Sequence, residues 1–332
     1  MSVSQSEINQ RTNTTETQQG QFKKNIVTFL NKMGIIVVVV LLCLLFSVLS
    51  SDFLTWNNIV NVARQTSISA ILAAGMTFVI LTGGIDLSIG AIVALAGVCA
   101  VYFTGFMPAP LGIFCGILVG GAAGYINGFL TSVTRLPAII VTLGSMTYLR
   151  GVAYVVTGGY PLMVESSFFK GIGTGYLGPI PIPVIIMIAV FAIAHVVLKY
   201  TVFGRNIYMV GGNEEAARLT GIKVTSSVTW VYTISGICAG IAGVILAARL
   251  FSGQPNAAMG YELDATAAVV LGGTSLVGGV GFIVGSLFGA LFMGVLSNGL
   301  TLLNVPYYWQ LIIKGLVIVL AIYIDRVRRK KS

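Results

Sequence analysis

Few residues of this sequence have side chains that could do acid–base, nucleophilic or metal chemistry, and their spacing predicts none of these activities. His195 stands alone near the end of an apolar run. The four cysteines lie inside apolar runs without metal-ligand spacing. No G-x-x-x-x-G-K-[S/T], H-E-x-x-H, C-x-x-C or G-x-S-x-G motif occurs. We therefore expect no catalytic residue, no metal site, no cofactor and no ATP hydrolysis by this chain itself.

The most conspicuous polar residue near an apolar run is Asp86, which follows Gly83 and Gly84 and precedes Ser88. A carboxylate at a membrane edge is a functional candidate by default, so these four residues could break a helix or line a pathway. Asp86 also directly precedes the apolar run that begins at Leu87, where it could cap a helix, and we favour this interpretation. The sequence leaves both roles open.

Further polar residues lie within or near apolar runs and could line a pathway for a neutral, hydroxyl-rich solute: Asn127, Thr142, Ser145 and Asn298. Equally, they could bond neighbouring helices to one another. Proton relays usually need several intramembrane carboxylates or histidines, and this chain has almost none. Lys314 lies inside the last apolar run, where snorkelling or pairing with an acid is expected rather than ion transport.

One long polar segment, at about 199–226, separates two hydrophobic halves. Within it Asn213 is a good helix N-cap, and the acids Glu214 and Glu215 stand where the positive end of a helix favours them. Arg218 is four residues after Glu214, and Gly221 suits the left-handed position after a helix. We predict a short helix at 213–221, with Ala216 and Ala217 forming a small, uncluttered face. This segment is either a docking surface for a partner, which we favour, or an ordinary ordered loop.

Composition places these elements in a membrane. Of the 332 residues, 56% are hydrophobic and 9% are charged, far from the values of soluble proteins. The net charge is +9, but the basic residues are spread over loop ends, where they orient a membrane chain instead of binding nucleic acid. We expect an all-α, polytopic domain at 33–325, preceded by a polar cytoplasmic tail at 1–32 and followed by a basic cytoplasmic tail at 326–332.

Apolar runs of roughly membrane-spanning length follow one another at about 34–50, 66–82, 87–103, 109–130, 137–157, 179–198, 228–248, 265–278, 281–303 and 308–324. The run at 265–278 is short and by length alone could be re-entrant. If it crosses, both termini are cytoplasmic and most basic residues, including the RRKK motif after the last run, face the cytoplasm. We therefore predict about ten transmembrane helices.

Glycine recurs in two patterns. In the fourth run it occupies every fourth position, at Gly112, Gly116, Gly120, Gly124 and Gly128, and in the ninth run it does so at Gly281, Gly285 and Gly289. Such stripes predict close helix packing. The segment at 83–90 also resembles that at 272–279, with Gly83 aligned to Gly272, which indicates a parallel internal repeat or a chance match in a glycine-rich chain.

Four blocks of the sequence together resemble the ribose-type permease family of bacterial ABC importers. They are GGIDLSIGAIVALAG (83–97), the N-G-F-L and R-L-P-A-I-I-V-T-L-G segment (127–144), GRNIYMVGGNEEAARLTGI (204–222) and ELDATAAVVLGGTSLVGGVG (262–281). The resemblance extends over nearly the whole chain after residue 35, and the blocks keep their order.

The resemblance implies a bundle of roughly ten helices per subunit, similar to the vitamin B12-type importers, in the plasma (bacterial inner) membrane. It also implies two ATP-binding subunits at the cytoplasmic loops, an extracytoplasmic sugar-binding protein and a second permease subunit, in a homodimer or a pair. Carried over residue by residue, Asn213, Glu214, Ala216, Ala217 and Gly221 fall on the family's cytoplasmic coupling segment, and the GG-x-D-L-S block is complete.

Two function classes remain. The first is the permease subunit of an ABC importer for a monosaccharide or a related polyol, driven by a separate ATPase. The second is an ion- or proton-coupled secondary carrier, or a passive facilitator, of a small neutral solute. The sparse intramembrane carboxylates and the punctuated polar segment favour the first class. Neither the sugar nor the pairing of permease subunits follows from the sequence.

Overall fold

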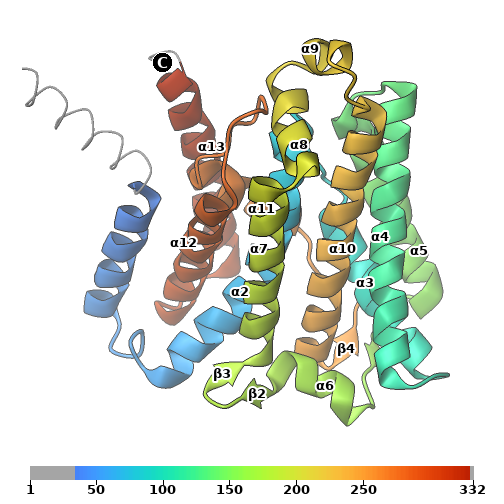
Figure 1. The fold of residues 1–332 in the computed structure, drawn as a ribbon. Coiled ribbons are helices and arrows are strands. Elements are labelled where there is room, and N and C mark those ends of the chain that lie inside the picture. Colours follow the sequence, from blue (N-terminus) through green and yellow to red (C-terminus); the bar gives the residue numbers. More distant parts are fainter. Residues whose placement is uncertain (1–33, 330–332) are drawn as a thin grey trace, which may run out of the picture.

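The computed structural model describes residues 34–329, and these are predominantly helical (Figure 1). The polar tail predicted for 1–32 lies outside the described residues, as do residues 330–332 of the predicted basic tail. Six helices are apolar and long enough to cross a membrane: α2 (Trp56–Leu81), α4 (Ala109–Thr134), α5 (Ala138–Thr157), α7 (Ile182–Tyr200), α10 (Val224–Leu250) and α12 (Ile283–Leu302). The chain is therefore an all-α, multi-pass membrane protein, as the sequence predicted.

The remaining elements are shorter or more polar. Three apolar helices have fewer than 18 residues in their apolar part: Gly34–Leu49, α3 (Ile89–Thr104) and the Tyr307–Tyr323 part of α13 (Tyr307–Arg329). Four further helices are α6 (Ser167–Thr174), α8 (Val202–Gly212), α9 (Glu214–Leu219) and α11 (Tyr261–Leu271). Two antiparallel pairs of two-residue strands complete the list: β1 (Leu162–Met163) with β4 (Ser252–Gly253), and β2 (Tyr176–Leu177) with β3 (Ile180–Pro181).

The two ends of the bundle carry different elements (Figure 1). Helices α8 and α9 lie at one end, where the helix Gly34–Leu49 also begins and α13 ends. Helix α6 and the β2–β3 hairpin lie at the opposite end, at the bottom of the figure. The polar segment predicted at 199–226 thus forms one end of the molecule.

The five-glycine stripe of α4 lies in close helix contacts, as the sequence predicted. A Cβ atom at Gly116 would lie 2.6 Å from the carbonyl oxygen of Ala96 in α3. Further along, a Cβ at Gly120 would lie 2.9 Å from the Cα of Gly240 in α10. Since lipid supplies no hydrophobic force between helices, this close approach stabilises the α3–α4–α10 contact through van der Waals packing. In the second stripe only Gly285 and Gly289 belong to a helix, because α12 begins at Ile283.

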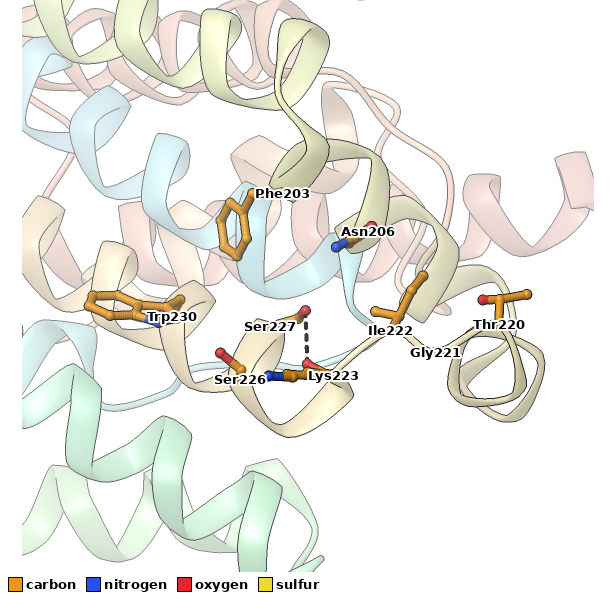
Figure 2. A pocket seen from close by; sticks show the side chains of 9 residues that line it. All are labelled: Phe203, Asn206, Thr220, Gly221, Ile222, Lys223, Ser226, Ser227 and Trp230. Atoms are coloured by element: carbon orange, nitrogen blue, oxygen red, sulfur yellow. Dashed lines mark hydrogen bonds between the residues drawn. The ribbon is translucent and has the colours of Figure 1, made fainter.

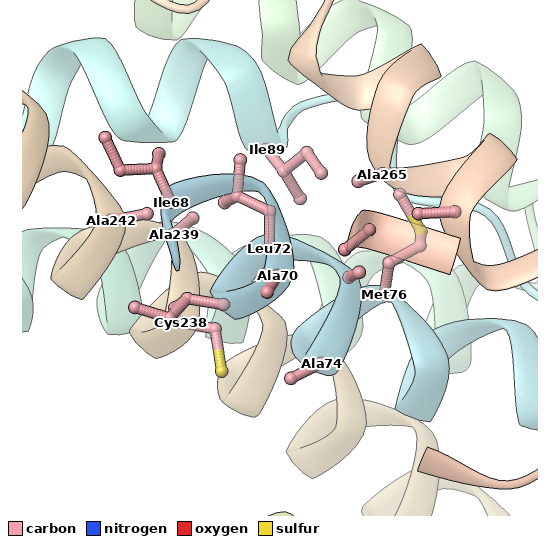
Figure 3. Packing of buried hydrophobic residues seen from close by; sticks show 14 of the residues in the cluster. Ile68, Ala70, Leu72, Ala74, Met76, Ile89, Cys238, Ala239, Ala242 and Ala265 are labelled. Atoms are coloured by element: carbon pink, nitrogen blue, oxygen red, sulfur yellow. The ribbon is translucent and has the colours of Figure 1, made fainter. Parts of the chain in front are cut away.

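Helix α2 runs through the core, where its side chains are covered on several sides. Ile68, Leu72 and Met76 are at most 2% exposed, and they lie between Ile89 of α3, residues of α10 and Ala265 of α11 (Figure 3). Both ends of the molecule are therefore connected through one central helix.

Helix α11 differs from the predicted run at 265–278. It spans 11 residues and ends at Leu271, because Gly272 and Gly273 turn the chain. Its length is about 16 Å, too short to cross a hydrocarbon core of about 30 Å. An irregular segment precedes it along α3: a Cβ at Gly253 would lie 3.0 Å from the Cα of Val98, and one at Gly90 would lie 2.6 Å from the carbonyl oxygen of Ala258. Helix α11 thus begins inside the bundle.

Candidate functional site

Helix α9 has the caps that its sequence predicted. The side chain of Asn213 accepts a hydrogen bond from the backbone N–H of Ala216 at 2.9 Å, and the Arg218 guanidinium donates to the Glu214 carboxylate at 2.7 Å. At the other end, Gly221 has φ +85°, and the N–H of Ile222 donates to the carbonyl of Ala217 at 3.1 Å. These bonds satisfy the free groups at both helix ends, so α9 is a defined, capped helix at the polar end of the bundle.

Of the two alanines predicted to form the exposed face of α9, only Ala216 is exposed. Ala217 is only 1% exposed, because α9 rests on α8 and on the start of α10 with this side. Ala216 is exposed, and Leu219 is 81% exposed although it is a large apolar residue. The surface available to a partner therefore consists of Ala216, the charged side chains of α9 and Leu219, and Ala217 belongs to the packing beneath them.

A cavity of about 380 Å³ lies beside α9 (Figure 2). Phe203 and Asn206 of α8 line one side, and Trp230 of α10 lines another. The chain from Thr220 to Lys223 passes along its edge, where the Ser227 hydroxyl donates to the Lys223 carbonyl at 3.2 Å. The polar end of the bundle is therefore hollowed beside the segment that follows α9.

The second group of predicted residues surrounds Asp86, which is fully buried between α2 and α3. Its carboxylate accepts from the N–H of Ser88 at 3.0 Å, from the Ser88 hydroxyl at 2.5 Å and from the Ser235 hydroxyl at 3.1 Å. Asn127 of α4 donates to the Ser88 hydroxyl at 2.8 Å. These contacts join the entry of α3 to α4 and α10.

The position of Asp86 agrees with part of the favoured helix-cap interpretation. It does stabilise the start of a helix, but α3 begins at Ile89, two residues later than predicted. The Asp86 carboxylate therefore bonds the residue before the helix and does not bond an N–H of its first turn. Gly83 and Gly84 form the preceding turn, in which Gly83 has φ +80°.

The uncharged polar candidates divide between two places. Thr142 and Ser145 of α5 are at most 2% exposed; the Thr142 hydroxyl donates to Ala138 of its own helix and lies 3.4 Å from the carbonyl oxygen of Ile85. Asn298 of α12 is elsewhere and forms a reciprocal amide pair with Asn58 of α2, at 2.8 and 3.1 Å. Asn127 and Thr142 thus lie near Asp86, whereas Asn298 joins α2 to α12.

Two charged side chains form partly buried contacts, of which only the pairing of Lys314 was among the expected outcomes. Arg150 of α5 donates to the carbonyl oxygens of Pro255 and Ala257 at 2.8 and 2.6 Å, which holds the irregular segment before α11. Lys314 of α13 was expected to snorkel or pair, and it pairs with Asp264 of α11 at 2.8 Å. The sequence could indicate only that Arg150 and Lys314, as charged residues in apolar surroundings, need partners, and not which partners they have.

Comparisons with known proteins agree with these observations. A family described as "Branched-chain amino acid transport system / permease component" matches residues 58–322. The chain belongs to this family. The matched residues extend from α2 into α13 and include both α9 and the buried carboxylate of Asp86.

Individual relatives resemble the chain over nearly their whole length. The ribose import permease protein of Bacillus subtilis is 45% identical over 324 residues, which cover 96% of this chain and 99% of the relative. That of Haemophilus influenzae is 44% identical, covering 90% and 94%. The L-arabinose ABC transporter permease protein of Azospirillum brasilense is 39% identical, covering 91% and 89%. The resemblance to ribose-type permeases is thus confirmed.

No solved structure matches the chain. The similarity to vitamin B12-type importer permeases that the sequence implied therefore stays a prediction. The names of the family and of its members also differ in substrate, since the family description concerns branched-chain amino acids and the relatives concern sugars. Family membership establishes a permease component and does not by itself select the solute.

Proposed function

We propose that this chain is the membrane-spanning permease subunit of an ABC importer and translocates a monosaccharide, ribose or a related sugar, with energy from a separate ATPase subunit. The observation that carries this proposal is the 45% identity to a ribose import permease over 99% of that relative. Because the alignment covers 96% of this chain, it includes both the buried helices and the polar end that would receive energy.

The described helices support ten membrane passages with both termini in the cytoplasm. Nine passages are the six long helices and the three shorter apolar ones. The tenth combines the irregular segment at 251–260 with α11, since non-helical backbone is tolerated at membrane depth where protein surrounds it. This count places the start of the first helix and the end of the last helix at the end of the bundle that carries α9. The polar segment at this end contains the basic residues Lys199, Arg205, Arg218 and Lys223. Labelling of a cysteine placed at Ser332 should require permeabilised cells.

Three partners complete the proposed importer: an ATPase subunit, an extracytoplasmic sugar-binding protein and a second permease subunit. Helix α9 supports the first, because a capped helix outside the apolar bundle offers a stiff surface, and Leu219 offers an exposed apolar anchor. The buried polar side chains of Asp86 and Asn298 are already bonded to other groups of the protein, so we assign selectivity for the sugar to the binding protein. We place both permease termini and the ATPase on the cytoplasmic side.

Reconstitution tests the function. The chain is placed in proteoliposomes with the ATPase subunit and the binding protein encoded in the same genome, and uptake of labelled ribose, arabinose and leucine is measured. We expect uptake of one monosaccharide that requires both ATP and the binding protein. Uptake of leucine and of neither sugar would show that the substrate is a branched-chain amino acid, the class that the family description names. Sugar uptake without the ATPase subunit would indicate a carrier or facilitator.

A pair of neighbouring alanines tests the role of α9. Ala216→Arg places a large charge on the exposed face, so we expect a normal amount of permease, weak co-purification of the ATPase subunit and lost ATP-driven uptake. Ala217→Arg forces the same charge into the contact with α8 and α10, and we expect a reduced amount of permease. Normal uptake and co-purification with Ala216→Arg would place the docking surface elsewhere.

A further inference from the structure

The last turn of α8 is seated in an unusually close backbone contact. Helix α8 leads directly into α9, and its residue Gly211 lies against the end of α2 and against the segment between α11 and α12. A Cβ atom at Gly211 would overlap the carbonyl oxygen of Leu81 at the end of α2. The same atom would lie 2.6 Å from the amide nitrogen of Gly279, after α11. Only glycine at position 211 therefore permits α8 to approach both segments, the end of α2 and the residues after α11.

The two segments that contact Gly211 are also joined to each other by a backbone hydrogen bond. The N–H of Gly279 donates to the carbonyl of Leu81 at 2.9 Å. A Cβ at Gly278 would lie 2.8 Å from the nitrogen of Gly83 and 2.9 Å from the carbonyl oxygen of Gly211. Three segments, from α2, α8 and the chain after α11, thus meet backbone to backbone, without a side chain between them to absorb a displacement.

A hydrogen bond adds a second attachment. The hydroxyl of Tyr208, one turn earlier in α8, donates to the carbonyl of Gly281 at 2.9 Å. Burial raises the pKa of this phenol, so it keeps its proton and remains a donor at physiological pH. Helix α8 is therefore held along its last turn and not at a single point.

The contact continues into the interior through the turn after α2. Gly83 is followed within three residues by Asp86, whose carboxylate holds Ser88 at the start of α3 and Ser235 of α10. The Gly83 turn is therefore connected to a hydrogen-bond network that includes α3 and α10. Only Asn213 lies between α8 and α9, so α9 is connected to this network through α8, the Gly83 turn and Asp86.

We propose that α8 is a rigid lever between α9 and the membrane interior, seated by Gly211 so that a displacement of α9 moves the turns after α2 and α11 together. This inference rests on the proposed function, in which the ATPase subunit acts on α9. The two turns, and Asp86 behind the first, would then be the places where ATP-driven motion enters the bundle. Gly211 and Tyr208 act as positioning residues in this arrangement.

Two adjacent glycines provide the test and its matched control. A Cβ at Gly212 has no atom within 4 Å, whereas one at Gly211 overlaps backbone. Each alanine variant is reconstituted with the ATPase subunit and the binding protein, and ATPase co-purification, ATP hydrolysis and sugar uptake per ATP are measured. For Gly211→Ala we expect retained co-purification and hydrolysis, with uptake per ATP reduced at least about fivefold. For Gly212→Ala we expect uptake within about twofold of the wild type.

If the Gly211→Ala permease does not accumulate in the membrane, Tyr208→Phe tests the same inference. This variant removes only the hydroxyl, so it should accumulate normally and lose about two- to fivefold in uptake per ATP. Wild-type coupling in Gly211→Ala overturns the inference, as does wild-type coupling in Tyr208→Phe when Gly211→Ala is absent from the membrane. A wild-type chain without ATP-driven uptake would instead contradict the proposed function, which the control liposomes measure separately.

Discussion

The junction between α2 and α3 and the junction between α11 and α12 begin with the same turn. After α2, the N–H of Gly83 donates to Ile80 at 2.9 Å and that of Gly84 to Val79 at 3.1 Å. After α11, Gly273 donates to Val270 at 2.9 Å and Thr274 to Val269 at 3.2 Å. Gly83 and Gly273 both have positive φ, +80° and +89°. The two segments that resemble each other in sequence thus form the same turn, but the structure aligns Gly83 with Gly273 and not with Gly272.

Beyond the turn the junctions differ. The offset between the two glycines is 273 − 83 = 190, which places Leu276 opposite Asp86. The first junction therefore carries a buried carboxylate bonded to the start of α3 and to α10. The second carries an apolar residue and, at Thr274, a buried hydroxyl without a hydrogen-bond partner among the described residues. Equal backbone turns are thus followed by unequal attachments, which indicates that the first junction is fixed by its own polar side chains and the second by backbone contacts and the hydroxyl of Tyr208.

The largest expected effect comes from removing the carboxylate. Asp86→Ala leaves the Ser88 N–H, the Ser88 hydroxyl and the Ser235 hydroxyl without an acceptor, and each unsatisfied buried group costs about 1–3 kcal/mol. We expect the free energy of unfolding in detergent to fall by about 3 kcal/mol or more. Asp86→Asn retains an acceptor oxygen and should lose less. Equal stability of Asp86→Ala and the wild type would show that the junctions do not differ as described.

An intermediate effect separates the two glycine turns. Alanine at either Gly83 or Gly273 must adopt a left-handed conformation, which costs about 1–2 kcal/mol. At Gly83 the new Cβ would also lie 3.1 Å from the carbonyl oxygen of Val277, whereas at Gly273 the nearest atom is the Phe282 ring at 3.8 Å. Gly83→Ala should therefore lower the midpoint of thermal unfolding more than Gly273→Ala. The reverse order would contradict the contact between the two junctions.

The sequence predicted what depends on neighbouring residues. The cap by Asn213, the Glu214–Arg218 pair and the stop at Gly221 involve only a few consecutive positions, and all three are present. The burial of Ala217 was missed because it depends on how α9 packs on α8 and α10. The end of α11 was placed too late, although Gly272 and Gly273 carried the signal for it.

Long-range pairing lay beyond the sequence. The partners of Asp86 and Ser88 on α10 and α4 lie 149 and 39 residues away, and the acid that pairs with Lys314 lies 50 residues earlier. Each of these residues invited the expectation of some partner, because a buried polar group needs one. Which partner it finds depends on helix contacts that the glycine stripe only partly specifies. The roles of these residues in transport stay predictions.

The smallest expected effect tests the hydroxyl of the second junction. Thr274 is fully buried, and its Oγ1 atom has no hydrogen-bond partner among the described residues. Valine has nearly the same shape without the hydroxyl, so Thr274→Val should leave the free energy of unfolding unchanged or raise it by about 1 kcal/mol. The matched change in the first junction is Ser88→Ala, which removes a bonded hydroxyl and should lower it by about 1–3 kcal/mol. Both values follow from denaturant titration in detergent. A loss in Thr274→Val as large as that in Ser88→Ala would show that Thr274 has a partner and that each junction is fixed by its own polar side chains.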